Sequence, residues 1–147
     1  MRRLLLIGYL TTLLASCSTP KLQWVEARKK ITVPGIPQAG PIVEFRLCMT
    51  SDRDIDHLAF DCLCVQNKCY QVSAFSDTLL PRTEVTSLRK GDQVFVIARN
   101  AAELDSACVQ ETAATRSTMI RLYYRINGKQ LSISQDQFNK VFRLLAP

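Results

Sequence analysis

Residues 119–134 read MIRLYYRINGKQLSIS, and this stretch carries the strongest fold signal in the chain. Apolar and polar residues alternate on both sides of Asn127-Gly128, which predicts two antiparallel strands joined by a tight turn. A type I′ turn needs positive φ at both central residues, and an Asn-Gly pair adopts it readily. In the resulting register Tyr124 lies opposite Leu131, so we expect one apolar face and one largely polar face.

A helical pattern follows this hairpin. Ser134 and Gln137 have the spacing of an N-terminal capping box. The apolar residues that come next recur at the spacing i, i+3, i+4 and i+7: Phe138, Val141, Phe142 and Leu145. We therefore expect a short C-terminal helix that packs on the sheet.

The rest of the chain adds further strands. Apolar and polar residues alternate over 42–50, which predicts a half-buried strand. Residues 60–74 predict a second hairpin that turns around residues 66–68, and a Lys90-Gly91-Asp92 turn precedes another apolar strand. Together these elements predict one α+β domain over 42–147, mainly antiparallel, with the C-terminal helix as its helical part.

Five of the six cysteines lie in this domain: Cys48, Cys62, Cys64, Cys69 and Cys108. Either register of the second hairpin places Cys62, Cys64 and Cys69 on one face. Zinc ligation by these three with a fourth ligand is one reading, but oxidation to disulfides is favoured in an exported protein. We expect a Cys64–Cys69 bridge, with Cys62 as the competing partner of Cys69. Cys48 with Cys108 is the expected long-range bridge.

The first residues of the chain have the features of a secretory signal. Met1-Arg2-Arg3 precedes an apolar run over residues 4–14 that is too short to span a bilayer. Leu14-Ala15-Ser16-Cys17 then resembles the lipobox of bacterial lipoproteins. The resemblance covers only the first 17 residues. It implies that residues 1–16 are removed as a lipoprotein signal peptide and that Cys17 is acylated on its thiol and its new amino terminus.

Acylation at Cys17 implies a membrane anchor without a transmembrane helix. Two or three acyl chains hold a protein stably, because each buried methylene contributes about 0.8 kcal/mol. In Gram-negative lipoproteins, Asp directly after the acylated cysteine signals retention in the inner membrane, and here that residue is Ser18. The resemblance therefore implies an anchor in the bacterial outer membrane, with the domain facing the periplasm.

Residues 17–41 are predicted to form a flexible lipidated tether, because prolines and glycines recur in them and disfavour a long helix or a central strand. Four apolar residues in it are unusual for a linker: Trp24, Val25, Ile31 and Val33. We expect these four to contact a partner, whose sheet edge could accept the segment as an added strand. Two alternatives stay open, namely a strand laid against the domain itself and a segment that rests on the lipid surface.

The composition narrows the function classes. Removing residues 1–16 takes away two of the 19 Lys and Arg and none of the 13 Asp and Glu, so the mature chain keeps a charge near +4. The expected compartment excludes nucleic acid as a partner. The chain has one histidine, no nucleophile motif and no phosphate loop, so we expect no enzyme activity, no cofactor and no metal site. Asp52, Asp54 and Asp56 have the spacing of a calcium loop, but His57 stands where that loop needs glycine.

The expected function is therefore structural: an outer-membrane lipoprotein that docks with another envelope protein, such as part of a secretion or conjugation apparatus. Residues 88–97 resemble a segment of bacterial SH3-like modules, many of which bind cell walls, so peptidoglycan is a further candidate partner. A phage- or plasmid-borne lysis or exclusion lipoprotein and a small envelope hydrolase remain as alternatives.

Overall fold

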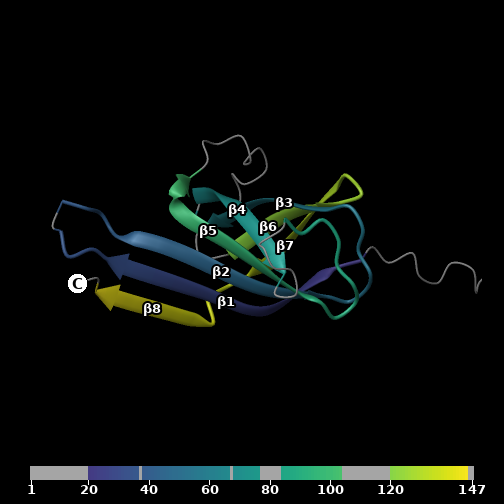
Figure 1. Ribbon diagram of the computed structural model, residues 1–147, viewed down its shortest axis with the longest axis horizontal. Helices are drawn as coiled ribbons and strands as arrows, with labels where there is room; N and C mark the ends of the chain where they lie inside the picture. Colours follow the sequence, from purple (N-terminus) through teal and green to yellow (C-terminus); the bar gives the residue numbers. More distant parts are fainter. Residues whose placement is uncertain (1–19, 37, 67, 77–83, 104–119, 146–147) are drawn as a thin grey trace, which may run out of the picture.

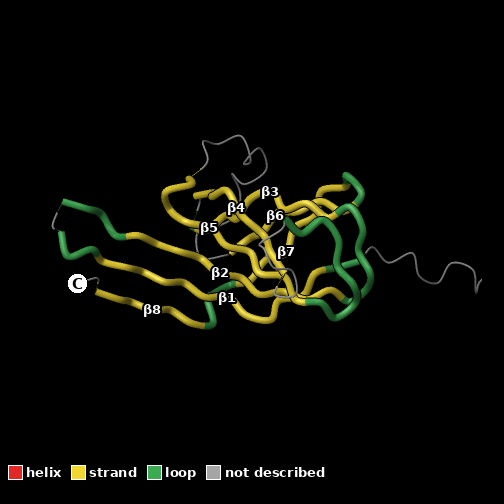
Figure 2. The backbone as a smooth tube through the Cα atoms, in the orientation of Figure 1, coloured by secondary structure: helices red, strands yellow, loops and turns green. Residues whose placement is uncertain are grey.

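A computed structural model describes residues 20–36, 38–66, 68–76, 84–103 and 120–145. All regular structure in these residues is β-strand, and Figure 2 shows no helix among them. The strands are β1 (Leu22–Val33), β2 (Ile42–Ser51), β3 (Leu58–Val65), β4 (Lys68–Ser76), β5 (Gln93–Glu103), β6 (Ile120–Ile126), β7 (Lys129–Gln135) and β8 (Lys140–Leu145). They form one sheet in the order β7-β6-β3-β4-β5-β2-β1-β8, in which only the β1–β8 pair is parallel.

The hairpin predicted from Asn127-Gly128 is confirmed. Asn127 has a φ of 52° and Gly128 a φ of 76°, as a type I′ turn requires. Tyr124 pairs with Leu131 in the expected register. The Lys90-Gly91-Asp92 turn also precedes a strand, with Gly91 at a φ of 86° and the Asp92 N–H donating to the Arg89 carbonyl at 3.0 Å.

The predicted C-terminal helix is wrong, and the described fold is all-β rather than α+β. Residues 140–145 form β8, which pairs with β1 from Arg28↔Lys140 to Val33↔Leu145. The open edge of β1 offers this segment backbone partners along its whole length, and its valine and phenylalanine favour a strand. That tertiary pairing overrides the helical spacing of Phe138, Val141, Phe142 and Leu145.

The flexible tether is also wrong for Leu22–Val33, which form β1 between β2 and β8. The alternative of a strand laid against the domain itself is the correct one. Leu22 and Ala27 are buried in the core, and a bulge between Trp24 and Glu26 changes which residues face inward. Pro20 and Pro34 lie just outside the strand, so they delimit it rather than interrupt it.

The sheet is strongly curled. Strands β7 and β8 lie at opposite edges, yet only residues 136–139 join them. The edges of a flat eight-stranded sheet would be about 34 Å apart, whereas this connection reaches about 17 Å at most. The edges therefore approach each other, and the Trp24 indole N–H donates to the Ser134 carbonyl oxygen at 3.1 Å across the seam.

The main core lies on the inner face of this curl. Its fully buried side chains include Leu47 and Met49 of β2, Leu63 of β3, and Ile120 and Leu122 of β6. A smaller cluster on the opposite face of the sheet contains Tyr123 and the three cysteines of the β3–β4 hairpin. No helix in the described part of the chain is long and apolar enough to cross a membrane.

Candidate interaction surface

Strands β1, β2 and β8 continue beyond the core as a three-stranded projection, toward the left in Figure 1. We call this projection the arm and define it as residues 28–43 and 140–145. None of the buried core residues in the described part of the chain belongs to it. The hydrogen bonds of three paired strands, rather than side-chain burial, hold the arm together.

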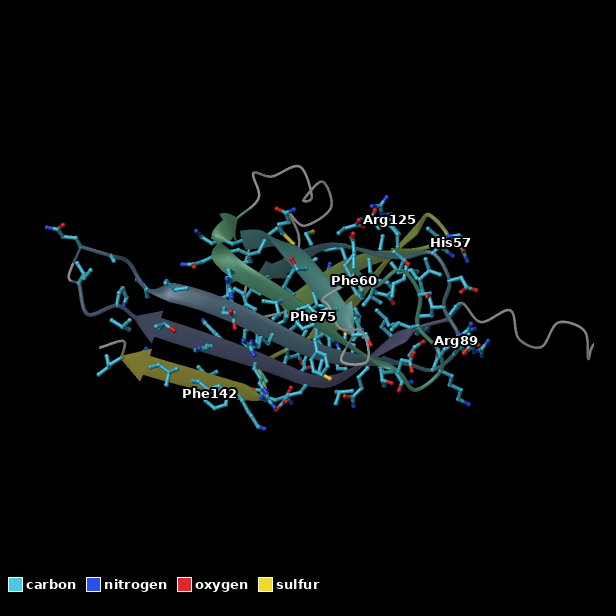
Figure 3. The ribbon with its side chains drawn as sticks, in the orientation of Figure 1. His57, Phe60, Phe75, Arg89, Arg125 and Phe142 are labelled. Carbon is cyan, nitrogen blue, oxygen red and sulfur yellow. A yellow bond between two sulfur atoms is a disulfide. The ribbon has the colours of Figure 1, made fainter. Side chains whose placement is uncertain are left out.

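The arm carries the exposed apolar surface of the described residues. All the large apolar side chains that are exposed among the described residues lie on the arm, except Val25, which lies three residues before the arm begins. These side chains are Val25, Val33, Ile36, Ile42, Val141, Phe142, Leu144 and Leu145. Leu145 is 83% exposed, and Figure 3 shows Phe142 on β8 well away from Phe60 and Phe75 in the body of the sheet. Exposed apolar patches of this kind mark interaction sites in soluble domains.

The charge of the arm is entirely positive. It contains Arg28, Lys29, Lys30, Lys140 and Arg143, and no Asp or Glu. The Lys29 ammonium lies 6.0 Å from the centroid of the Phe45 ring, where the arm meets the core. A partner surface that neutralises the arm must therefore be acidic.

Two glutamates at the root of the arm are already engaged within the chain. Glu26 accepts a hydrogen bond from Arg28 Nε at 2.6 Å and lies 2.7 Å from Lys140 Nζ. The contact with Arg28 has the largest effect on the pKa of Glu26 and the contact with Lys140 the next largest. The pKa falls from 4.5 to about 2. Burial raises the pKa of Glu44, but hydrogen bonds from Arg46 and Arg99 outweigh it and the pKa is lowered overall.

Asn139 fixes the start of β8. The Ala27 N–H donates to Asn139 Oδ1 at 2.8 Å, and the Asn139 N–H donates to the Ala27 carbonyl at 2.8 Å. Gln135 Nε2 also donates to Asn139 Oδ1 at 3.1 Å. Together with the Glu26–Lys140 ion pair, these bonds hold β8 in parallel register beside β1.

The four partner-binding candidates from the sequence occupy different environments. Trp24 packs against the core and bonds to Ser134, so it closes the sheet. Ile31 is half-buried in the middle of the arm, whereas Val25 and Val33 are exposed. Sequence reasoning missed six exposed residues: Ile36, Ile42, Val141, Phe142, Leu144 and Leu145. Val141, Phe142 and Leu145 had been assigned to the predicted helix. Had residues 140–145 been interpreted as a strand, the sequence would have indicated an apolar edge strand there.

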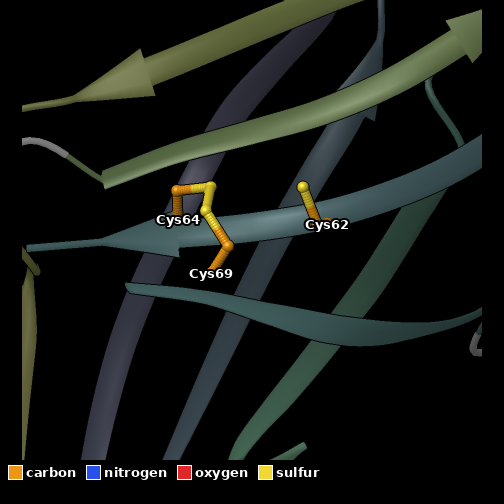
Figure 4. A group of neighbouring side chains, drawn as sticks. All are labelled: Cys62, Cys64 and Cys69. Carbon is orange, nitrogen blue, oxygen red and sulfur yellow. A yellow bond between two sulfur atoms is a disulfide. The ribbon is translucent and has the colours of Figure 1, made fainter. Parts of the chain in front are cut away.

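The cysteines of the β3–β4 hairpin confirm one predicted bridge. Cys64 lies opposite Cys69 in the register, and the two are joined by a disulfide, seen as the yellow bond in Figure 4. Cys62 shares their face, as the strand parity predicts, while Leu63 and Tyr70 belong to the main core. The sulfur atoms of the three cysteines lie within 4.8 Å of one another, but all three, Cys62 included, are disulfide-bonded, and zinc needs thiolates.

The three cysteines outside the β3–β4 hairpin are Cys17, Cys48 and Cys108. Cys48 is half-buried on β2 and lines a cavity of about 290 Å³ at the root of the arm, together with Val25, Glu26, Arg28, Arg46, Leu47, Gln93 and Phe95. Cys17 and Cys108 lie outside the described residues. Cys48 forms no disulfide, so the predicted Cys48–Cys108 bridge is wrong.

Removing the Cys64–Cys69 disulfide with the double substitution Cys64→Ala and Cys69→Ala is expected to lower the free energy of unfolding by about 2 kcal/mol, because the bridge restricts the unfolded chain over a short loop. Urea denaturation measures this loss, and Cys48→Ala is the control for removing a cysteine outside the bridge. Trypsin cleaves after Lys68, so the two cysteines fall on peptides that stay joined until reduction. A Cys69 thiol that alkylates without reduction contradicts the bridge.

The acidic turn at the other end of the molecule is engaged within the chain. Asp54 accepts a hydrogen bond from the Lys90 N–H at 2.8 Å and another from the Arg89 guanidinium at 3.2 Å. Both lower the pKa of Asp54, and the bond from Lys90 has the larger effect. Asp52 accepts the Lys21 N–H at 3.1 Å. Figure 3 shows His57 and Arg89 at this end, opposite Phe142. The carboxylates of Asp52 and Asp54 therefore join neighbouring segments of the chain.

No model of a known protein family matches the chain, and no curated protein matches it either.

Proposed function

We propose that this protein is a lipoprotein anchored in the bacterial outer membrane, and that it acts by binding another protein of the cell envelope rather than by catalysis. The lipobox residues Leu14-Ala15-Ser16-Cys17 support the anchor. The arm supports the binding role. A secretion or conjugation apparatus is the kind of assembly in which such a protein would work.

The exposed apolar residues of the arm are the observation that carries this proposal. Seven exposed large apolar side chains gather on this projection and an eighth, Val25, lies beside it, and none of them belongs to the core of the described residues. Full burial of one such side chain against a partner contributes about 1.5 to 3 kcal/mol. A small sheet needs a packed hydrophobic face to be stable by itself, and the arm leaves seven large apolar side chains exposed, so we explain these side chains by what the arm binds.

The position of the arm relative to the anchor favours a protein partner. Cys17 is five residues before Leu22, a stretch that reaches about 17 Å at most. From there β1 runs for 12 residues, or about 40 Å, toward the arm, and Figure 1 shows its first residues at the end of the molecule opposite the arm. The arm can therefore extend from the anchored end toward a partner.

Photocrosslinking in cells tests the binding role. A photoreactive residue at position 25 or 36 is expected to yield adducts to a defined envelope protein, because Val25 and Ile36 are 48% and 67% exposed. The matched control is the same residue at position 129 on β7, which is exposed but lies at the other edge of the sheet. Adducts to lipid or within the chain alone, or equal yields at all three positions, would show that the arm binds no protein.

A further inference from the structure

Strand β8 ends the sheet, and no other described strand lies beside its outer edge. All six of its residues are exposed: Lys140, Val141, Phe142, Arg143, Leu144 and Leu145. The opposite edge strand, β7, has polar exposed residues such as Gln130 and Ser132 and no exposed large apolar side chain. The two edges of this sheet therefore differ in chemistry, and only β8 combines an open backbone ladder with apolar side chains.

The backbone of β8 favours a protein strand over other occupants. An edge strand presents a row of N–H and C=O groups that a neighbouring strand can pair with. Lipid offers no such partners, so a membrane would leave these groups unsatisfied. Charged residues commonly protect an edge, but here Lys140 is held by Glu26 at 2.7 Å, which leaves Arg143 as the charged residue in the middle of β8.

The charge of the arm determines which strand fits. A second copy of the chain would bring basic residues of its own arm, Arg143 among them, against this edge, and like charges across strands are destabilising. A partner strand with acidic residues would pair with Arg143. Phe142 and Leu144 lie on the other face of β8 from Arg143, so the partner's alternate residues should be apolar.

We propose that β8 accepts a ninth strand, supplied by an extended segment of a partner protein in which acidic and apolar residues alternate. The segment pairs with the backbone of residues 140–145, its apolar residues cover Phe142 and Leu144, and its acidic residues meet Arg143 and the basic residues beside it. This inference rests on the proposed partner-binding function and names the kind of partner.

Amide hydrogen exchange tests the added strand. The probe is an eight-residue peptide of alternating Glu and Val, added to the full lipidated chain in phosphatidylcholine nanodiscs. The peptide is expected to slow exchange at residues 140–145 and not at residues 129–135. A Lys-Val peptide and a Glu-Val peptide with alternate N-methylated amides should each have little effect, because one repels Arg143 and the other lacks the ladder donors.

Several outcomes would overturn the proposal. Equal protection by the Lys-Val or N-methylated peptide would show that neither charge nor backbone pairing selects the ligand. Protection produced by phosphatidylglycerol nanodiscs without peptide would assign the edge to a membrane surface. Protection that rises with protein concentration alone would assign it to a second copy of the chain.

Charge reversal provides a matched variant. Arg143→Glu, on an exposed residue, is expected to weaken the Glu-Val peptide about fivefold and to strengthen the Lys-Val peptide, as one attractive cross-strand pair becomes repulsive. Lys129→Glu on β7 makes the same charge change at the other edge and should leave both affinities unchanged. An unchanged peptide preference in Arg143→Glu would overturn the proposal.

The two proposals fail differently. If positions 25 and 36 crosslink to an envelope protein while the peptides leave residues 140–145 unprotected, the binding function stands and strand addition at β8 is wrong. If the peptides protect residues 140–145 but no envelope protein crosslinks in cells, the added-strand chemistry stands and the proposed function is wrong.

Discussion

Replacing Cys17 with alanine is expected to abolish both incorporation of a palmitate analogue and recovery of the protein with the outer membrane. The lipobox resemblance implies that the Cys17 thiol accepts acyl chains, and each buried methylene of such chains contributes about 0.8 kcal/mol to membrane attachment. The loss should be complete rather than partial, because alanine has no thiol to accept these chains.

Metabolic labelling and membrane fractionation measure this effect side by side. Cys48→Ala is the matched control, because it removes a cysteine of the folded domain and should keep both the label and the fractionation of the wild type. A Cys17→Ala protein that still takes up label and still sediments with the outer membrane would show that the resemblance to a lipobox is accidental.

Leu47→Ala is expected to lower the free energy of unfolding by about 3 to 4 kcal/mol. Leu47 is fully buried on β2, paired with Ala27 of β1 on one side and Val96 of β5 on the other. Truncating a leucine at such a site loses its transfer free energy and leaves a cavity that the surrounding strands fill only partly. Urea denaturation should show a lower midpoint with an unchanged slope.

Leu144→Ala makes the same chemical change on the arm and serves as the control. Leu144 is 48% exposed, so its loss should cost less than about 1 kcal/mol. If Leu144→Ala destabilises the protein as much as Leu47→Ala does, the arm is part of the folding core, and its apolar residues no longer indicate a binding surface.

Local sequence patterns determined the hairpins correctly because both the turn and the alternation lie within a few residues. Asn127-Gly128 fixes a type I′ turn by its own backbone preferences, and the alternation around it then fixes which side chains face the core. The same parity put Cys64 and Cys69 on the face away from Leu63, and the structure then selected the register in which Cys64 lies opposite Cys69. Strand period and turn geometry suffice for such pairs.

The candidate surface was only half visible from the sequence. Trp24, Val25, Ile31 and Val33 were singled out as unusual for a linker, and two of them, Val25 and Val33, are exposed next to or within the arm. The apolar residues of 140–145 were assigned to a helix instead. A segment of six apolar and basic residues is compatible with a helix or a strand, because it is too short for its periodicity to decide between them.

Tertiary structure alone decided what residues 22–33 and 140–145 become. The sequence by itself determined that antiparallel strands dominate and set the register of the last hairpin, but it predicted an α+β domain and left two registers open for the β3–β4 hairpin. It did not determine that these two segments, more than a hundred residues apart, pair in parallel at one edge of the sheet. That pairing depends on backbone hydrogen bonds between distant strands, on Asn139 against Ala27 and on Lys140 against Glu26. Backbone groups are the same in every residue, so no local pattern identifies their partner, and only the assembled sheet places β8 beside β1, at the edge of the strands that the structure describes.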